Sequence, residues 1–287
     1  MDFERIKRLV IIAMFSDDGL MNKLVLKGGN LLDVVFGISS RASMDLDFSI
    51  EDDFETLQLL QEKVSRALTT TFGEEGYIVF DINIRDVPPV LSPNMADFWG
   101  GYKIDFKIIN KKEYDNLKGE MRSLRMGAHR IGEGGSPKFK IDISKHEYCA
   151  EKRSKLLDGY TIYTYSPEMV VGEKIRAVCQ QMPDYVAIVR SHPSARARDF
   201  LDIHAVIEHF GINLDAESFR NILRGMFAVK RVPLVLIGKI ADFREYHRPD
   251  FVAVQATVKP GLPLRDFDFY FDYLIEKCRS LESLWNV

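Results

Sequence analysis

The sequence predicts an α+β fold in which an N-terminal mixed sheet with flanking helices is followed by a C-terminal helical domain. Strand and helix signals alternate in the first half, and the pattern becomes helical after Ser166 and Pro167. The length of 287 residues also corresponds to two domains at roughly 150 residues each. We place the boundary near residue 165, which gives an N-terminal domain of residues 1–165 and a helical domain of residues 166–287.

In the N-terminal domain, the spacing of apolar residues distinguishes strands from helices. Residues 3–15 are typical of a buried amphipathic helix. A helix is also expected over 54–71, capped by Asp52 or Asp53 and ended by Gly73. Shorter helices are expected at 30–36 and 111–124. Strands are expected at 24–27, 44–50, 77–84, 102–109 and 139–143, with 160–165 as an additional edge strand.

In the C-terminal domain, Ser166 is a favourable N-cap and Pro167 suits the first position of a helix. Gly211 is a typical stop residue for the second helix of this domain. Helices are expected near 167–181, 195–210, 215–228, 232–246 and 264–282.

The composition excludes several classes of protein. Hydrophobic residues make up 46% of the chain and charged residues 28%, which is ordinary for a folded protein. The three cysteines are far apart and show no CxxC spacing, so a reducing cytoplasm is expected rather than a disulfide framework or a zinc site. The apolar run over residues 9–15 is too short to span a membrane, and no membrane partner is expected.

Two aspartates, Asp45 and Asp47, alternate along the strand expected at 44–50. Residues i and i+2 of a strand point to the same face, so these carboxylates lie side by side and favour a cation such as Mg²⁺ between them. Gly28 and Gly29 lie between the preceding strand and helix, where glycines let backbone N–H groups approach a phosphate. Together these features are the minimum needed for transfer from a nucleoside triphosphate.

Each feature alone has a simpler interpretation. A glycine pair is usually a turn. Met44, Leu46 and Phe48 alternate with the acids, so this strand could simply be half-buried. The functional interpretation is favoured because the features occur in this order, with Arg41 and Ser43 between them.

The segment from Lys27-Gly28-Gly29 to Arg41-x-Ser43-x-Asp45-x-Asp47 resembles the first motif of the AbiEii/AbiGii toxin-type nucleotidyltransferases, in the DNA polymerase β-like nucleotidyltransferase superfamily. Residues 173–177, around Lys174, resemble the lysine motif of that family, and residues 196–202 resemble its last acidic motif. Much of the superfamily has Gly-Ser where this chain has Gly28-Gly29, so a phosphate-binding serine is absent here. Asn30 is a candidate for that polar contact.

The resemblance implies a nucleotidyltransferase fold, a nucleoside triphosphate substrate, and Mg²⁺ or Mn²⁺ held by Asp45, Asp47 and a third acid. Gly28, Gly29, Arg41, Ser43 and Lys174 would bind the nucleotide, and the helical domain would complete the active-site cleft. Family members include toxins that modify tRNA, so the resemblance also implies an RNA acceptor, tRNA in particular. It implies that the protein is the toxin of a toxin–antitoxin or phage-defence system, with a cognate antitoxin as partner.

The third acid has two candidates, Asp105 and Asp142, which both follow Lys-Ile on an expected strand. Apolar neighbours on both sides place either aspartate on the opposite face of its strand. The resemblance favours Asp142, because the third acid of the family lies on a later strand, and Asp105 remains the alternative. The simpler interpretation of either aspartate is an exposed strand position.

Lys174 lies in an apolar helical stripe with Val170 and Val178, although lysine is almost never buried without a partner. The resemblance implies that it contacts the triphosphate, and that Asp199 orients it or binds nucleotide. The structural alternative is a salt bridge from Lys174 to Asp199 or Asp202. Asp199 and Asp202 would otherwise be helix-surface charges paired with nearby arginines.

The net charge of −3 conceals two unlike segments. Residues 41–60 carry six acids and one base, whereas residues 121–160 carry nine bases and five acids. A basic surface near an anionic metal site suits a polyanionic acceptor such as RNA, although scattered surface charge is more often only solvated. Two other functions remain open: transfer to a small molecule or a protein hydroxyl, and a non-catalytic binding module that keeps the fold.

Overall fold

The computed structural model describes residues 2–38, 45–130, 135–189, 192–258 and 263–285. The chain divides into two compact units, which are described separately. The first contains most of the chain up to Thr164. The second contains the chain from Tyr165 onward together with Glu147–Lys152 and a short segment beginning at Phe36.

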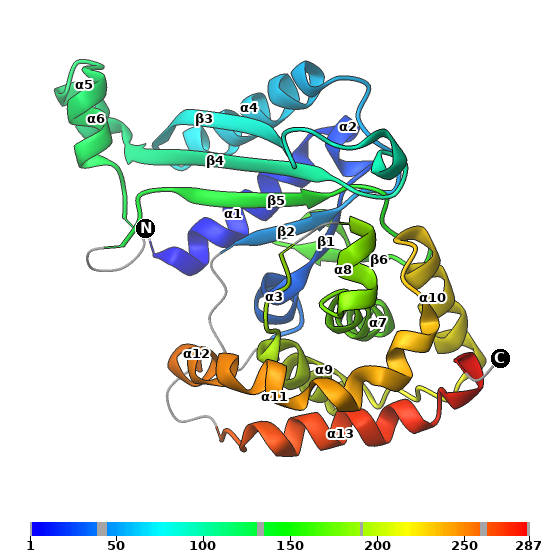
Figure 1. Ribbon diagram of the computed structural model, residues 1–287. Coiled ribbons are helices and arrows are strands. Elements are labelled where there is room, and N and C mark those ends of the chain that lie inside the picture. The colour runs from blue at the N-terminus through cyan, green and yellow to red at the C-terminus, as the bar shows by residue number, and fades with distance from the viewer. Residues whose placement is uncertain (1, 39–44, 131–134, 190–191, 259–262, 286–287) are drawn as a thin grey trace. The chain divides into compact units, whose positions relative to one another are not determined.

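The first unit is built on a seven-stranded mixed sheet with the strand order β3-β4-β5-β2-β1-β7-β6 (Figure 1). Strand β2 pairs parallel with β5, and β1 pairs parallel with β7, while the remaining neighbours are antiparallel. The strands are β1 (Val25–Lys27), β2 (Leu46–Ser49), β3 (Tyr77–Val87), β4 (Gly101–Asn110), β5 (Phe139–Ser144), β6 (Arg153–Leu157) and β7 (Tyr160–Thr164).

Two long helices of this unit pack against each other. The first of them also packs against β7 and the second against β3. They are α1 (Phe3–Ser16) and α4 (Leu57–Glu74). Shorter elements are α2 (Asp18–Met21), α3 (Gly28–Asn30), a π-helical turn (Leu31–Val35), a 3₁₀ turn (Pro93–Met95), α5 (Lys111–Asn116) and α6 (Met121–Gly127).

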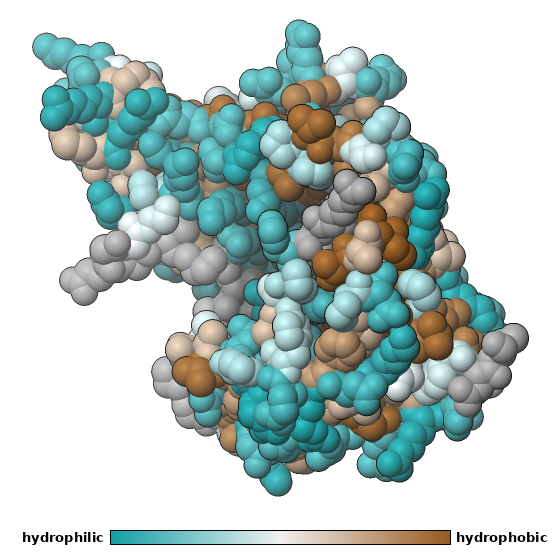
Figure 2. Space-filling view, viewed as in Figure 1, coloured by the Kyte–Doolittle hydropathy of each residue, from teal (hydrophilic) through white to brown (hydrophobic). Residues whose placement is uncertain are grey.

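The two faces of the sheet differ in polarity, as alternation along β5 illustrates. Phe139, Ile141 and Ile143 are buried, whereas Lys140 is exposed and Asp142 is half-buried. Side chains alternate between faces along a strand, so one face forms the core with α1 and α4 and the other presents polar groups. Figure 2 shows a mainly hydrophilic surface over β4 and β5.

The second unit is helical, as predicted. Ser166 caps its first helix by accepting a hydrogen bond from the Met169 N–H, and Gly211 ends α9 in the left-handed conformation. The helices are α7 (Pro167–Cys179), α8 (Pro183–Val189), α9 (Ala197–Phe210), α10 (Glu217–Val229), α11 (Arg244–His247), α12 (Phe251–Thr257) and α13 (Phe267–Arg279). The described residues of this unit also form 3₁₀ segments at Leu234–Phe243, Arg248–Asp250 and Glu282–Leu284.

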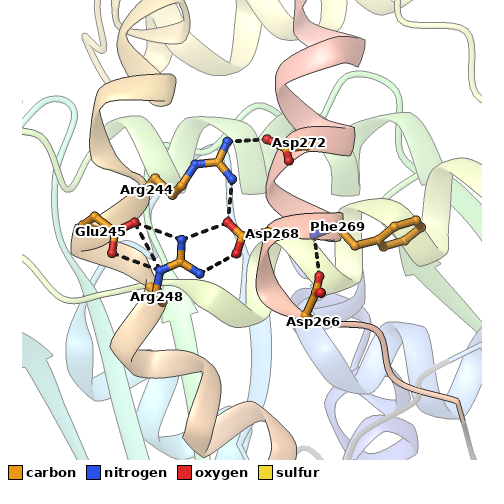
Figure 3. Close-up of polar contacts among 7 residues, drawn as sticks. All are labelled: Arg244, Glu245, Arg248, Asp266, Asp268, Phe269 and Asp272. Atoms are coloured by element: carbon orange, nitrogen blue, oxygen red, sulfur yellow. Dashed lines mark hydrogen bonds and ion pairs between the residues drawn. The ribbon is translucent and has the colours of Figure 1, made fainter.

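An exposed cluster of ion pairs joins α11 and the following 3₁₀ turn to α13 (Figure 3). Arg244 Nη1 lies 2.6 Å from an Asp268 oxygen, and Arg248 reaches both Asp268 oxygens at 2.7 and 2.9 Å. The two guanidinium groups hold the pKa of Asp268 at about 2.

Several predicted element boundaries are wrong in detail. Helix α4 begins later than expected and is capped by Thr56, whose hydroxyl accepts from the Leu59 N–H at 3.1 Å, instead of Asp52 or Asp53. It continues through Gly73, because Gly76 with φ +76° makes the left-handed turn instead.

Two expected helices are interrupted. The helix predicted over 111–124 is two helices, because Lys118 and Gly119 both have positive φ and cannot continue a helix. The helix predicted over 232–246 is a 3₁₀ segment followed by α11.

The expected edge strand at 160–165 is β7, which lies between β1 and β6 and is therefore internal. The outer strand, β6, was missed because four of its five residues are exposed and it shows no alternation. Asp158 and Gly159, both with positive φ, form the tight turn between β6 and β7, and this Asp-Gly pair is the signal that could have identified the hairpin.

Candidate active site

Two of the carboxylates predicted from the sequence lie side by side at the centre of the sheet. Asp47 on β2 and Asp142 on β5 are direct register partners of a parallel pair, so their side chains leave the same face. Asp45 immediately precedes β2. Its negative charge raises the pKa of Asp142, so Asp45 lies within electrostatic range of that acid.

The environment of Asp142 reflects this crowding. Burial raises the pKa of the Asp142 carboxyl, and the negative charge of Asp45 raises it further, while Lys103 and Lys140 oppose the shift. A cation at this position would relieve the repulsion between the carboxylates.

The donor set fits a hard divalent cation, because it offers carboxylate oxygens on adjacent strands. Within the described part of the chain, no three His, Cys, Asp or Glu side chains are gathered into a preformed metal site. A metal ion would therefore have to draw the carboxylates of Asp45, Asp47 and Asp142 together.

The glycine turn packs directly against one of these acids. Gly28 follows β1 with φ +72°, and a Cβ atom there would lie 2.9 Å from both Cβ and Cγ of Asp47. Any other residue would be strained and would displace the carboxylate. The glycine is therefore required by the position of Asp47, a reason that the sequence did not reveal.

Asn30 connects the glycine turn to the start of the carboxylate strand. Its side-chain Nδ2 donates to the Asp45 carbonyl at 2.6 Å, and the residue is fully buried. Its Oδ1 atom has no hydrogen-bond partner among the described residues. The side chain of Asn30 therefore holds the backbone carbonyl of Asp45 in place.

The two candidates for the third acid occupy different strands. Asp105 lies on β4, opposite Lys140, and pairs with Arg85 at 3.0 Å. It shares the polar face with Asp142 but is one strand farther from Asp47. The geometry favours Asp142, whose catalytic role remains a prediction. Arg41 and Ser43 lie outside the described residues.

In the helical unit, Lys174 forms salt bridges to both Asp199 and Asp202, which is the alternative to a contact with the triphosphate. Its Nζ atom lies 3.0 Å from Asp199 Oδ1 and 2.7 Å from Asp202 Oδ2, and all three side chains are at most 5% exposed. Burial alone would raise the pKa of Asp199, but the charges of Arg196 and Lys174 outweigh it and hold that pKa well below its usual range. The acids are thus buried partners rather than surface charges.

Two residues missed by the sequence reasoning support this cluster. His247 is fully buried, and its Nδ1 atom accepts from the Arg196 N–H at 3.0 Å. Burial lowers the pKa of His247 to about 4. Asp250 accepts from the Ala197 N–H at 3.0 Å and so caps α9 from a distant part of the chain. Neither contact has a local sequence signal.

Comparisons with known proteins agree with this architecture. The model of the family described as nucleotidyl transferase AbiEii toxin, type IV TA system, matches residues 10–273. No curated protein matches the chain. The fold is similar to that of JHP933 from Helicobacter pylori, with 17% identity and a TM-score of 0.50 over 98% of this chain and 91% of that chain.

A candidate nucleotidyltransferase from H. pylori is similar to the same degree, with 16% identity and a TM-score of 0.50 over 98% of this chain and 94% of that chain. At these identities the likeness concerns the fold alone. It confirms the predicted mixed sheet followed by helices. No helix of the described residues is long and apolar enough to cross a membrane.

Proposed function

Because the chain belongs to the AbiEii nucleotidyltransferase toxin family of type IV toxin–antitoxin systems, we propose that it transfers a nucleotide from a nucleoside triphosphate to an RNA acceptor, tRNA in particular, with Mg²⁺ as cofactor. Family membership establishes a nucleotidyltransferase and confirms the resemblance seen in the sequence. The metal, the acceptor and the roles of individual residues are the proposal.

The observation that carries this proposal is the register of β2 and β5, which pairs Asp47 directly with Asp142. A solvated surface gains nothing from placing two acids side by side, because like charges directly opposite each other are destabilising. A divalent cation turns the same arrangement into a binding site. Crowded acids beside a glycine turn are what nucleotide transfer requires.

Asp45, Asp47 and Asp142 would hold Mg²⁺, which when bound supplies positive charge that stabilises the phosphates during transfer. Asp142 also helps to activate the acceptor hydroxyl by accepting its proton. That oxygen forms the new bond to the α-phosphorus, and the bond to pyrophosphate breaks. Gly28 and Gly29 bind phosphate through backbone N–H groups.

For the helical unit, the family resemblance supports a role for Lys174 in supplying positive charge to the triphosphate, with Asp199 orienting Lys174. The contact supports the orienting role, because Asp199 lies within hydrogen-bond distance of Lys174. Asp202 shares the same ammonium group and stabilises its burial. A cognate antitoxin is the expected protein partner of a toxin from this type of system.

The test is incubation of the full chain with each labelled nucleoside triphosphate in turn, Mg²⁺ and total RNA. Label in tRNA is the expected result, and it should disappear when EDTA is added. Label on protein or on small molecules would show that the acceptor is a hydroxyl of another molecule and not of RNA. No label with any of the four nucleotides, in RNA or elsewhere, would contradict the proposal.

A further inference from the structure

A straight row of charged residues crosses the polar face of the sheet. Successive register partners on five neighbouring strands are Arg85 on β3, Lys103 on β4, Asp142 on β5, Asp47 on β2 and Lys27 on β1. Direct partners in a sheet share a face, so these five side chains leave the same side of it. Neighbouring strands are about 4.8 Å apart, so Arg85 lies about 10 Å from Asp142 along the row.

The cations on the β3–β4 side of the acids are accessible. The side chains of Arg85 and Lys103 are 49% and 48% exposed. Lys140, two residues before Asp142 on β5, is also exposed and leaves the same face. These three residues are called the cationic strip below.

Internal ion pairing does not account for the strip. Lys103 Nζ lies 3.8 Å from Asp142, beyond hydrogen-bond distance, and exposed pairs of this kind contribute about 0–1 kcal/mol to stability. Arg85 pairs with Asp105 but keeps half of its side chain exposed. Three accessible cations beside the carboxylates, two of them in the row and Lys140 next to it on β5, are complementary to a chain of phosphates.

The order of the strands separates this strip from the glycine turn. Gly28 follows β1, on the opposite side of the two acids from β4 and β3. If the glycine turn holds the donor triphosphate, the strip lies where a second anion would reach the acids from the other side.

We propose that Arg85, Lys103 and Lys140 bind the phosphate backbone of the RNA acceptor next to its reacting hydroxyl. This inference rests on the proposed RNA acceptor and adds the surface that holds it. The RNA chain runs from the carboxylates over β5 and β4 toward β3. These contacts are to phosphate, so they contribute affinity and orientation but little sequence preference.

The test measures binding of a 5′-fluorescein-labelled single-stranded RNA to the full chain by anisotropy, over a series of salt concentrations. The variant is Lys103→Gln combined with Lys140→Gln, and the matched control is Lys155→Gln, an exposed lysine of β6 at the far edge of the sheet. We expect the double variant to bind roughly tenfold more weakly and its salt slope to fall by about 1.4, since each phosphate contact on a single strand contributes about 0.7. The control should bind like the wild type.

Transfer kinetics with total tRNA provide the second readout. The KM for tRNA should rise in the double variant, while the KM for the nucleotide stays within about twofold of the wild type. Unchanged RNA affinity would overturn the inference, as would a rise in the nucleotide KM equal to that for tRNA. If the wild type transfers label to protein or small molecules only, the RNA acceptor itself fails. If the wild type labels tRNA but the double variant binds RNA normally, the role of the cationic strip is contradicted and the RNA acceptor stands.

Discussion

The charged residues of the two units are arranged in opposite ways. In the helical unit, Lys174, Asp199 and Asp202 form a closed cluster that is at most 5% exposed. In the sheet unit, Lys103 lies 3.8 Å from the half-buried Asp142 and keeps 48% of its side chain exposed. One cluster has its charges paired within the protein, and the other leaves them accessible to a ligand.

This difference predicts which changes affect folding first. A buried lysine with two carboxylates at hydrogen-bond distance fixes α7 against α9, and removing one partner leaves an uncompensated charge. Acids aligned by strand register repel one another, so their arrangement costs stability unless a cation is bound. We therefore expect changes in the helical cluster to affect folding first and changes in the sheet to affect transfer.

The largest effect on folding is expected from Asp202→Ala, which removes one partner of the buried Lys174. The free energy of unfolding should fall by about 3–5 kcal/mol, as is usual when a buried ion pair is broken on one side. Urea denaturation followed by circular dichroism measures this. A loss below about 1 kcal/mol would mean that the cluster does not stabilise the helical unit.

Gly28→Ala should reduce transfer roughly a hundredfold, because the added Cβ would displace the Asp47 carboxylate and small misplacements at a reacting centre cost about that much. The matched control is Gly76→Ala, which has a similar positive φ of +76° but nothing within 4 Å of the added Cβ. The control should lose about 1 kcal/mol of stability from backbone strain and keep its activity. Equal activity of the two variants would contradict the role given to Gly28.

Stability should depend on pH through His247. Its folded pKa of about 4 lies below the unfolded value of about 6.5, so below pH 6.5 the unfolded state binds the proton first and stability falls as pH falls. Between pH 7.5 and 5 the loss should be about 2 kcal/mol. Urea denaturation at each pH should show this loss in the wild type and a smaller one in His247→Gln. An equal loss in both would assign the dependence to other groups.

The smallest effect is expected at the exposed cluster of Figure 3. Asp268→Asn removes a carboxylate that contacts both Arg244 and Arg248, yet exposed ion pairs are worth about 0–1 kcal/mol. The midpoint of urea denaturation should therefore move little compared with Asp202→Ala. A loss as large as that of Asp202→Ala would remove the contrast between buried and exposed pairs.

Much of the sheet unit could be predicted because its signals are local. Alternation identified β4 and β5, and the spacing of Asp45 and Asp47 identified the acids. The alternation could not decide between Asp105 and Asp142, since both follow Lys-Ile. Only the strand order, which depends on long-range pairing, places Asp142 beside Asp47.

The contacts that depend on distant parts of the chain were not predictable. His247 and Asp250 reach the start of α9 across more than 50 residues, and no periodicity encodes such a contact. The pairing of Lys174 with both acids was foreseen as an alternative, because Asp199 and Asp202 lie one helical turn apart.

The most direct measurement compares nucleotide transfer to tRNA by Asp142→Asn and Asp105→Asn under the same Mg²⁺ concentration. The two residues share their local sequence and their face of the sheet but differ by one strand in distance from Asp47. Asp142→Asn should lose several kcal/mol of metal-dependent stabilisation of the transition state. The rate of transfer should therefore fall roughly 10²–10³-fold. Asp105→Asn should stay within about threefold of the wild type, since it removes no proposed metal ligand. Comparable loss in both variants, or loss in Asp105→Asn alone, would contradict the assignment of the site.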